Sequence, residues 1–290
     1  MAGKIKSSAI ITYTVAAVTI LLIAIKSISE QRHYFCEHYN SPSSARFYNN
    51  NGPTAKDGYI AHGGGIHEFL YTNSREAVID SLKRGFQFIE LDLIETDDGH
   101  LLAAHDRDYF CKITGLPKNS KLDSATIKKV KIDGKYTVLL GRDIYKLMLE
   151  HPEMILITDK ITNYDLLMRE IPLPDRMILE CFSTSGVVQA KKCGFPHAAY
   201  SIFNEPQLEL AIKYNLKLVI ISGNFAFSSP NIIDKLRNMH NSGICIMAYS
   251  GICSDPDIIH HHLGKTFSKF YVDKWAPTSL PPANTANPAE

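Results

Sequence analysis

Eight short apolar segments, separated by amphipathic helical segments, constrain the fold of this chain more than any other feature. Each apolar run is nearly continuous, as in strands that are covered on both faces of a parallel sheet. The strand segments are 59–64, 86–94, 154–159, 177–183, 198–203, 216–222, 244–250 and 270–275. The helical segments are 74–85, 143–152, 164–171, 186–194, 206–215, 230–243 and 255–264.

Eight strands that alternate with helices predict an α/β protein built as a closed (β/α)₈ barrel, the TIM barrel. The alternative is a doubly wound open sheet. The usual fingerprint of that fold is G-x-G-x-x-G, and residues 62–67, HGGGIH, lack its spacing. The barrel is therefore the preferred interpretation.

A charge-free segment precedes the barrel. Residues 9–25, AIITYTVAAVTILLIAI, are flanked by Lys4, Lys6 and Lys26 and are not followed closely by an Ala-x-Ala cleavage site. We therefore predict an uncleaved transmembrane signal anchor within residues 1–28, with a cleaved signal peptide as the alternative. Lysines in the short N-terminal tail favour an inside N-terminus and a domain outside the cytoplasm, in the periplasm or at the cell surface.

The remaining boundaries follow from composition. Residues 29–57 are polar and rich in turn-forming residues and are predicted to be a stalk, residues 58–275 hold the barrel, and the Pro- and Ala-rich residues 276–290 are predicted to be a disordered tail. A net charge of +1 gives no reason to expect nucleic acid as a partner. The six cysteines form no CxxC pair, so a zinc site is not expected, and the sequence does not indicate an oligomeric state.

Acidic residues interrupt the second apolar segment. Glu90 and Asp92 are two residues apart, so on a strand both side chains point to the same side. Buried carboxylates need a cation, and oxygen ligands suit Mg²⁺ or Ca²⁺. Asp159, at the end of the next barrel strand, is the natural third ligand. By contrast, Asp97 and Asp98 form a turn with Gly99 and are expected to be solvated.

Residues 59–106 carry a resemblance to a known family. The segment contains AHGGG and continues as YTNSREAVIDSLKRGFQFIELDLIETDDGHLLAAHD. This pattern resembles the signature of the glycerophosphodiester phosphodiesterases, within the wider group that includes phosphatidylinositol-specific phospholipases C and spider-venom phospholipases D. The residues that carry the resemblance are His62, Asn73, Gly85, Glu90, Asp92, Asp98, Gly99, His105 and Asp106.

The resemblance implies metal-dependent cleavage of a phosphodiester that has a neighbouring hydroxyl group. His62 and His105 are then the general acid and base, in an order that the sequence leaves open. A structural role is the alternative hypothesis for two aspartates. Asp106 would cap a turn, and Asp273 would form a salt bridge that closes the barrel. Residues 107–141 stand where the family carries a small subdomain that covers the substrate.

Two positions depart from the family pattern. The family has Arg directly after its first His, where this chain has Gly63. Gly63 and Gly64 are predicted to let the backbone approach the phosphate. The family also has Lys two residues after its third acid, whereas Lys160 directly follows Asp159. Adjacent strand side chains point apart, which argues against Lys160 reaching the metal site; with Glu180, it remains a candidate substrate-binding residue.

An anchored barrel would act near lipid head groups or envelope polymers. The candidate substrates are lysophospholipids, glycerophosphodiesters and glycerol-phosphate polymers. Two other functions stay open: a membrane-anchored transferase that moves a phosphoglycerol or head group onto an envelope glycan, and a binding protein that keeps the barrel without turnover.

Overall fold

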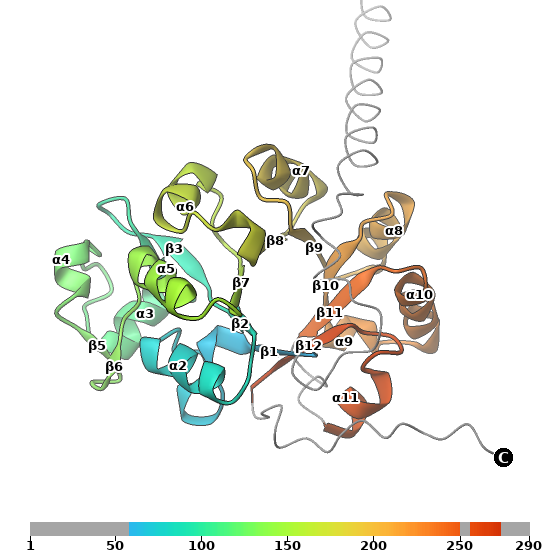
Figure 1. Cartoon of the computed structure of the whole chain (residues 1–290), viewed down its shortest axis with the longest axis horizontal. Coiled ribbons are helices and arrows are strands. Elements are labelled where there is room, and N and C mark those ends of the chain that lie inside the picture. Colours follow the sequence, from blue (N-terminus) through green and yellow to red (C-terminus); the bar gives the residue numbers. More distant parts are fainter. Residues whose placement is uncertain (1–57, 250–255, 274–290) are drawn as a thin grey trace, which may run out of the picture. The chain divides into compact units, whose positions relative to one another are not determined.

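The predicted barrel is confirmed by a computed structural model, which describes residues 58–249 and 256–273. Eight parallel strands form a closed ring in which β1 pairs with both β2 and β12 (Figure 1). The strands are β1 (Tyr59–Ala61), β2 (Phe88–Glu90), β7 (Ile155–Thr158), β8 (Met177–Cys181), β9 (Ala198–Ile202), β10 (Leu218–Ser222), β11 (Cys245–Tyr249) and β12 (Lys269–Val272). Closure of the ring excludes the open doubly wound sheet.

All seven predicted helical segments are helical. The helices of the barrel are α2 (Arg75–Lys83), α5 (Gly141–Glu150), α6 (Tyr164–Glu170), α7 (Thr184–Lys192), α8 (Glu205–Lys213), α9 (Gly223–Ala226), α10 (Pro230–Asn241) and α11 (Pro256–His262). Only the short α9 was not expected. Side chains cap several of these helices at their start, as Ser183 does for α7 and Asn204 does for α8. The caps let each helix begin within a few residues of the preceding strand.

The second apolar segment is not one strand, which corrects the prediction for residues 86–94. The barrel strand β2 ends at Glu90, and β3 (Leu93–Glu95) pairs antiparallel with β4 (Leu101–Ala103) outside the barrel. A side chain from outside the segment holds the backbone at the break. The backbone N–H of Asp92 donates to Oδ1 of Asn73 at 3.0 Å, so a side chain takes the place of a neighbouring strand.

Asp97 and Asp98 are exposed turn residues, as expected, and both also hold the following segment in place. The guanidinium of Arg107 donates two hydrogen bonds to Asp97, at 2.9 and 2.7 Å, and the amide of Leu122 donates a third. Asp98 accepts hydrogen bonds from the amide and the hydroxyl of Ser124. The turn therefore connects the β3–β4 hairpin to residues 107–124.

Residues 93–140 form a small subdomain beside the barrel. Besides the hairpin, it contains α3 (Arg107–Thr114), α4 (Ser124–Ile127), and the paired strands β5 (Lys131–Ile132) and β6 (Tyr136–Thr137). In Figure 1, α3, α4, β5 and β6 lie together outside the ring, next to α2 and α5. An apolar core of its own supports the subdomain, made by Leu102, Ala104, Phe110, Cys111, Leu122, Ile127 and Leu140.

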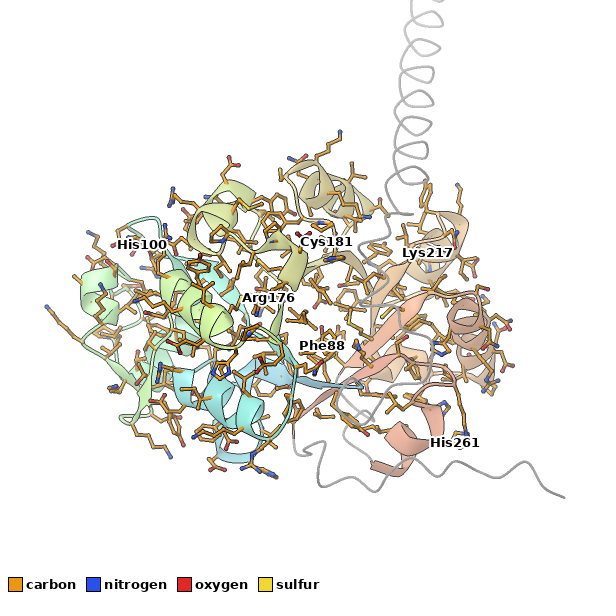
Figure 2. All side chains as sticks on the ribbon, in the orientation of Figure 1. Phe88, His100, Arg176, Cys181, Lys217 and His261 are labelled. Atoms are coloured by element: carbon orange, nitrogen blue, oxygen red, sulfur yellow. The ribbon has the colours of Figure 1, made fainter. Side chains whose placement is uncertain are left out.

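The barrel interior is filled by side chains from all eight strands. Phe88, labelled in Figure 2, packs there with Ile157, Ile178 and Ile220. The ammonium of Lys269 lies 3.9 Å from the centre of the Phe88 ring, in a cation–π contact. Apart from Lys269, these contacts make the interior a packed apolar core.

The membrane prediction falls outside this description. Within residues 58–249 and 256–273, no helix has the length and apolar character needed to cross a bilayer. The predicted anchor at residues 9–25, the stalk at residues 29–57 and the tail at residues 276–290 lie outside the described residues.

Arg176 joins the end of α5 to the start of β7. Arg176 is labelled in Figure 2. Its guanidinium donates to the carbonyl oxygens of Met148, His151 and Met154 at 2.7–3.1 Å. Carbonyl groups in the last turn of a helix have no hydrogen-bond partner within the helix. The guanidinium of Arg176 supplies hydrogen bonds to such groups in place of water.

We predict that Arg176→Lys lowers the free energy of unfolding by about 1–3 kcal/mol, because an ammonium group cannot reach all three carbonyl groups. Urea unfolding followed by circular dichroism measures the change. Arg142→Lys on the exposed side of α5 is the control, and its effect should stay within about 0.5 kcal/mol. Equal effects of the two variants would contradict the role of Arg176.

Candidate active site

Three carboxylates meet at the carboxyl ends of two neighbouring strands. Glu90 ends β2, Asp92 follows two residues later, and Asp159 directly follows β7, which pairs with β2. Each residue offers a carboxylate oxygen, and these atoms all lie within 4.8 Å of one another. Glu90 and Asp92 are buried. The structure thus brings together the three residues that the sequence proposed as metal ligands.

The cluster has the chemistry of a cation site. Among the described residues, Oδ1 of Asp159 is buried and has no hydrogen-bond partner. Burial first, and then the charge of Asp92, raise the pKa of Asp159 to about 7. Burial and the same neighbour raise the pKa of Glu90 well above its usual value. A divalent cation would supply the missing partner and stabilise the ionised carboxylates, so the residues present fit the metal.

Lys160 reaches the carboxylates, which corrects the argument from strand alternation. Its ammonium donates to Oδ1 of Asp92 and lies 3.9 Å from Oδ2 of Asp159. β7 already ends at Thr158, and Lys160 has a left-handed backbone with φ of 62°. The turn therefore brings Lys160 to the same side as Asp159, and the rule for adjacent strand residues does not apply.

Asn73 is a functional residue to which the sequence argument assigned no role. Its Oδ1 accepts a hydrogen bond from the backbone amide of Asp92, and its Nδ2 donates a hydrogen bond to Oδ2 of Asp92, both at 3.0 Å. This double hydrogen bond holds the backbone and the carboxylate of Asp92 together. The signal was present in the sequence, because Asn73 is part of the motif, but its partner is 19 residues away.

Both candidate catalytic histidines are supported by an aspartate. Nδ1 of His62 lies 3.0 Å from Oδ1 of Asp273, and Nδ1 of His105 lies 2.7 Å from Oδ2 of Asp106. A carboxylate only accepts hydrogen bonds, so each Nδ1 is the protonated donor and Nε2 remains for the substrate. The aspartates also have structural roles. Asp106 caps α3, and Asp273, which follows the last barrel strand, contacts His62, which follows the first.

The two glycines after His62 do not have the predicted role. The amide of Gly63 donates to Oε2 of Glu90 at 2.7 Å, so it is not directed at a phosphate. Gly63 has φ of 56°, and a Cβ there would come within 2.8 Å of the Tyr71 backbone. The family's Arg is therefore incompatible with this backbone. Gly64 is buried against α2, and neither glycine lines the cavity.

Glu180 adds a fourth carboxylate at the rim. It lies on β8, accepts a hydrogen bond from the hydroxyl of Ser201 at 2.6 Å, and has its pKa raised by burial to about 7. Together these groups surround a cavity of about 490 Å³. The predicted site residues that line it are His62, Glu90, Asp92, His105, Asp159, Lys160 and Glu180. Aromatic side chains complete the wall, and these are Tyr71, Tyr109, Phe182, Phe203, Tyr249 and Tyr271.

The fold and this geometry define a (β/α)₈ barrel whose rim combines a metal-compatible acidic cluster with two aspartate-supported histidines. No protein-family model matches the chain, and no curated protein matches its sequence. Solved structures do match. A glycerophosphoryl diester phosphodiesterase from Parabacteroides distasonis has a TM-score of 0.63 and 13% identity, over 83% of this chain and 94% of that one.

Two further structures show the same likeness. A phosphodiesterase from Oleispira antarctica, solved with the product sn-glycerol-3-phosphate, has a TM-score of 0.61 and 14% identity, over 78% of this chain and 95% of that one. A glycerophosphodiester phosphodiesterase from Thermotoga maritima has a TM-score of 0.56 and 20% identity, over 74% and 94%. The chain therefore has the fold of the glycerophosphodiester phosphodiesterases, as the resemblance of residues 59–106 implies.

The raised carboxyl pKa values predict a pH-dependent effect of the cation on stability. A carboxyl whose pKa rises from about 4 in the unfolded chain to about 7 in the folded one removes stability as the pH increases through that range. Mg²⁺ or Ca²⁺ offsets this loss. We therefore expect the gain in unfolding free energy to be small at pH 5 and larger at pH 8, reaching about 2.7 kcal/mol when the cation is at 100 times its Kd.

Thermal unfolding in chelator and in excess Mg²⁺ or Ca²⁺ measures this gain. Asp159→Asn should abolish it, while Asp175→Asn, at an exposed position in the short 3-10 helix Pro174–Arg176, should retain it. A gain that is equal at pH 5 and pH 8, or one that persists in Asp159→Asn, would show that the cation binds elsewhere.

Proposed function

We propose that the protein is a divalent-cation-dependent phosphodiester hydrolase that acts on glycerophosphodiesters or lysophospholipid-type diesters. One observation carries the proposal: a single cavity holds three clustered carboxylates and two aspartate-supported histidines, on the fold of the glycerophosphodiester phosphodiesterases. Fold alone does not imply function, so the residues of the cavity provide the argument.

Glu90, Asp92 and Asp159 are the proposed ligands of one Mg²⁺ or Ca²⁺ ion. When bound, such an ion neutralises charge on the phosphate and polarises its P–O bonds. Lys160 is the one Lys or Arg that lines the cavity in the described part of the chain. It is therefore the donor we assign to the phosphate in place of the Arg that Gly63 replaces.

The two histidines divide the proton transfers. At Nε2, one histidine takes the proton from the attacking hydroxyl, which belongs to the substrate or to water, and the other gives a proton to the leaving alkoxide. Asp273 and Asp106 accept the hydrogen bond from each Nδ1 and so keep the two rings oriented. The side chain of His62 is 18% exposed and that of His105 is 51% exposed, so His105 is nearer to solvent.

The charge of the small subdomain supports an anionic substrate at a lipid surface. Residues 107–137 contain eight Lys and Arg residues against three Asp residues, although the whole chain has a net charge of only +1. Tyr109, on α3, lines the cavity, so this basic segment adjoins the site. Such a segment attracts the negative charge that every phosphodiester carries, and it favours approach to an anionic lipid or polymer surface.

We predict that His62→Ala and His105→Ala each reduce hydrolysis of glycerophosphocholine by a factor on the order of 10²–10⁴. The losses should not multiply in the double variant, because both groups serve one cycle of proton transfer. His151→Ala, outside the cavity, is the control. A bis(p-nitrophenyl) diester needs no general acid, so activity on it should be retained in one variant, and that residue is the acid.

A histidine whose replacement leaves the rate on every substrate within about threefold of wild type has no part in the mechanism. If the wild type releases no product from any diester with Mg²⁺ or Ca²⁺, the proposed hydrolase activity is wrong. Transfer of the phosphoryl group to an added glycan, found by product analysis, would replace hydrolysis by the transferase alternative.

For location, we propose that residues 9–25 anchor the chain with the barrel outside the cytoplasm. The support is the charge-free segment with lysines before it. Protease added to intact cells, after removal of any outer barrier, should digest the barrel while a soluble cytoplasmic marker survives. Complete protection of the barrel under those conditions would reverse the proposed orientation.

A further inference from the structure

Two exposed phenylalanines mark the mouth of the cavity. Among the described residues, four large apolar side chains are strongly exposed: Leu149, Phe182, Phe203 and Ile212. Phe182 is 47% exposed and Phe203 is 40% exposed, and both line the cavity. Removing exposed aromatic surface from water is favourable. Because both rings lie at the mouth of one cavity, they are suited to contact an apolar group of a ligand.

The barrel brings the two rings together. Phe182 directly follows β8, whose last residue, Cys181, is labelled in Figure 2, and Phe203 directly follows the neighbouring strand β9. Their ring centres are 6.1 Å apart and the planes differ by 27°, so the rings stack as one platform. We refer to Phe182 and Phe203 as the aromatic platform.

The aromatic platform continues into the catalytic centre. The Phe203 ring meets Tyr249 edge to face at 6.4 Å, and Tyr249 meets Tyr271 at 5.9 Å. Tyr271 in turn lies 5.4 Å from the ring of His62. One wall of the cavity is therefore aromatic from the mouth to the histidine, whereas the carboxylates and Lys160 supply the polar part of the lining.

Polar side chains beside the platform are already engaged. Ser183 accepts from the Gly186 amide and caps α7, and Asn204 accepts from the Gln207 amide and caps α8. The side-chain oxygen of Gln207 accepts the amide of Phe203 itself. A sugar would need directed hydrogen bonds there, so the platform is better suited to a group without hydrogen-bonding atoms.

We propose that the aromatic platform binds the hydrocarbon chain of a lysophospholipid substrate, whose phosphodiester lies among the carboxylates and histidines. The inference rests on the proposed function and narrows its substrate class from small glycerophosphodiesters to diesters that carry an acyl or alkyl chain. A quaternary ammonium group is best bound between rings that face it from several sides. Phe182 and Phe203 stack on each other instead, so the platform suits a hydrocarbon chain better than a choline group.

The test compares two substrates with the same phosphocholine group, glycerophosphocholine and the soluble hexanoyl lysophosphatidylcholine, using full-length protein in lipid nanodiscs. Phe182→Ala and Phe203→Ala should each lower the ratio of kcat/KM for the chain-bearing substrate to that for the small one by about tenfold, mainly through KM. Leu149→Ala and Ile212→Ala remove equally exposed apolar side chains outside the cavity and should leave the ratio unchanged.

Phe182→Leu and Phe203→Leu separate apolar contact from recognition of a cation. Leucine keeps the apolar surface, so the ratio should stay within about threefold of wild type. If Leu and Ala variants lose activity equally on both substrates, the rings bind the choline group and the inference is wrong. An unchanged ratio in the Ala variants also overturns it.

Calorimetric binding of hexylphosphocholine and of phosphocholine keeps the inference separate from catalysis. Wild type should bind the hexyl compound at least about tenfold more tightly, and Phe203→Ala should remove that difference. If no substrate is hydrolysed but the hexyl compound still binds more tightly, the proposed function is wrong and the inference about the aromatic platform is supported. If chain length has no effect on binding, the platform inference fails whatever the turnover.

Discussion

Repulsion between three clustered carboxylates, two of them buried, is the constraint on which the rest of the site depends. Carboxylate oxygens of Glu90, Asp92 and Asp159 lie within 4.8 Å of one another at the ends of β2 and β7, and burial raises the pKa of Glu90 and of Asp159. The protein partly balances them with the Gly63 amide, the Asn73 side chain and the Lys160 ammonium. One buried oxygen of Asp159 still has no partner in the described part of the chain, which is the physical reason to expect a cation.

Closure of the barrel determines which distant residues can support that site. β12 pairs with β1, and this pairing places Asp273 next to His62 although 211 residues separate them in the sequence. The second histidine is held locally, by the next residue, Asp106. The small subdomain is attached through Asp97 and Asp98, so the same hairpin that follows the carboxylates also positions the segment that carries Tyr109.

Much of the fold was predictable because strand and helix periodicity act locally. The eight barrel strands, seven of the helices and the meeting of the three carboxylates all follow from pattern and spacing. What the pattern did not predict depends on backbone turns and long-range contacts. Lys160 reaches Asp92 through a left-handed residue, Gly63 faces Glu90, and Phe182 stacks on Phe203 only because β8 and β9 are neighbours. None of these contacts has a periodic signal in the sequence.

The most direct test of the account is a calorimetric titration of metal-free protein with Mg²⁺ and with Ca²⁺. The account predicts one binding site in the wild type and loss of that site in Glu90→Gln, because the amide removes a charged ligand from the cluster. Glu95→Gln, on the exposed hairpin, should bind the cation as the wild type does. Unchanged affinity in Glu90→Gln would contradict the claim that these carboxylates form the cation site.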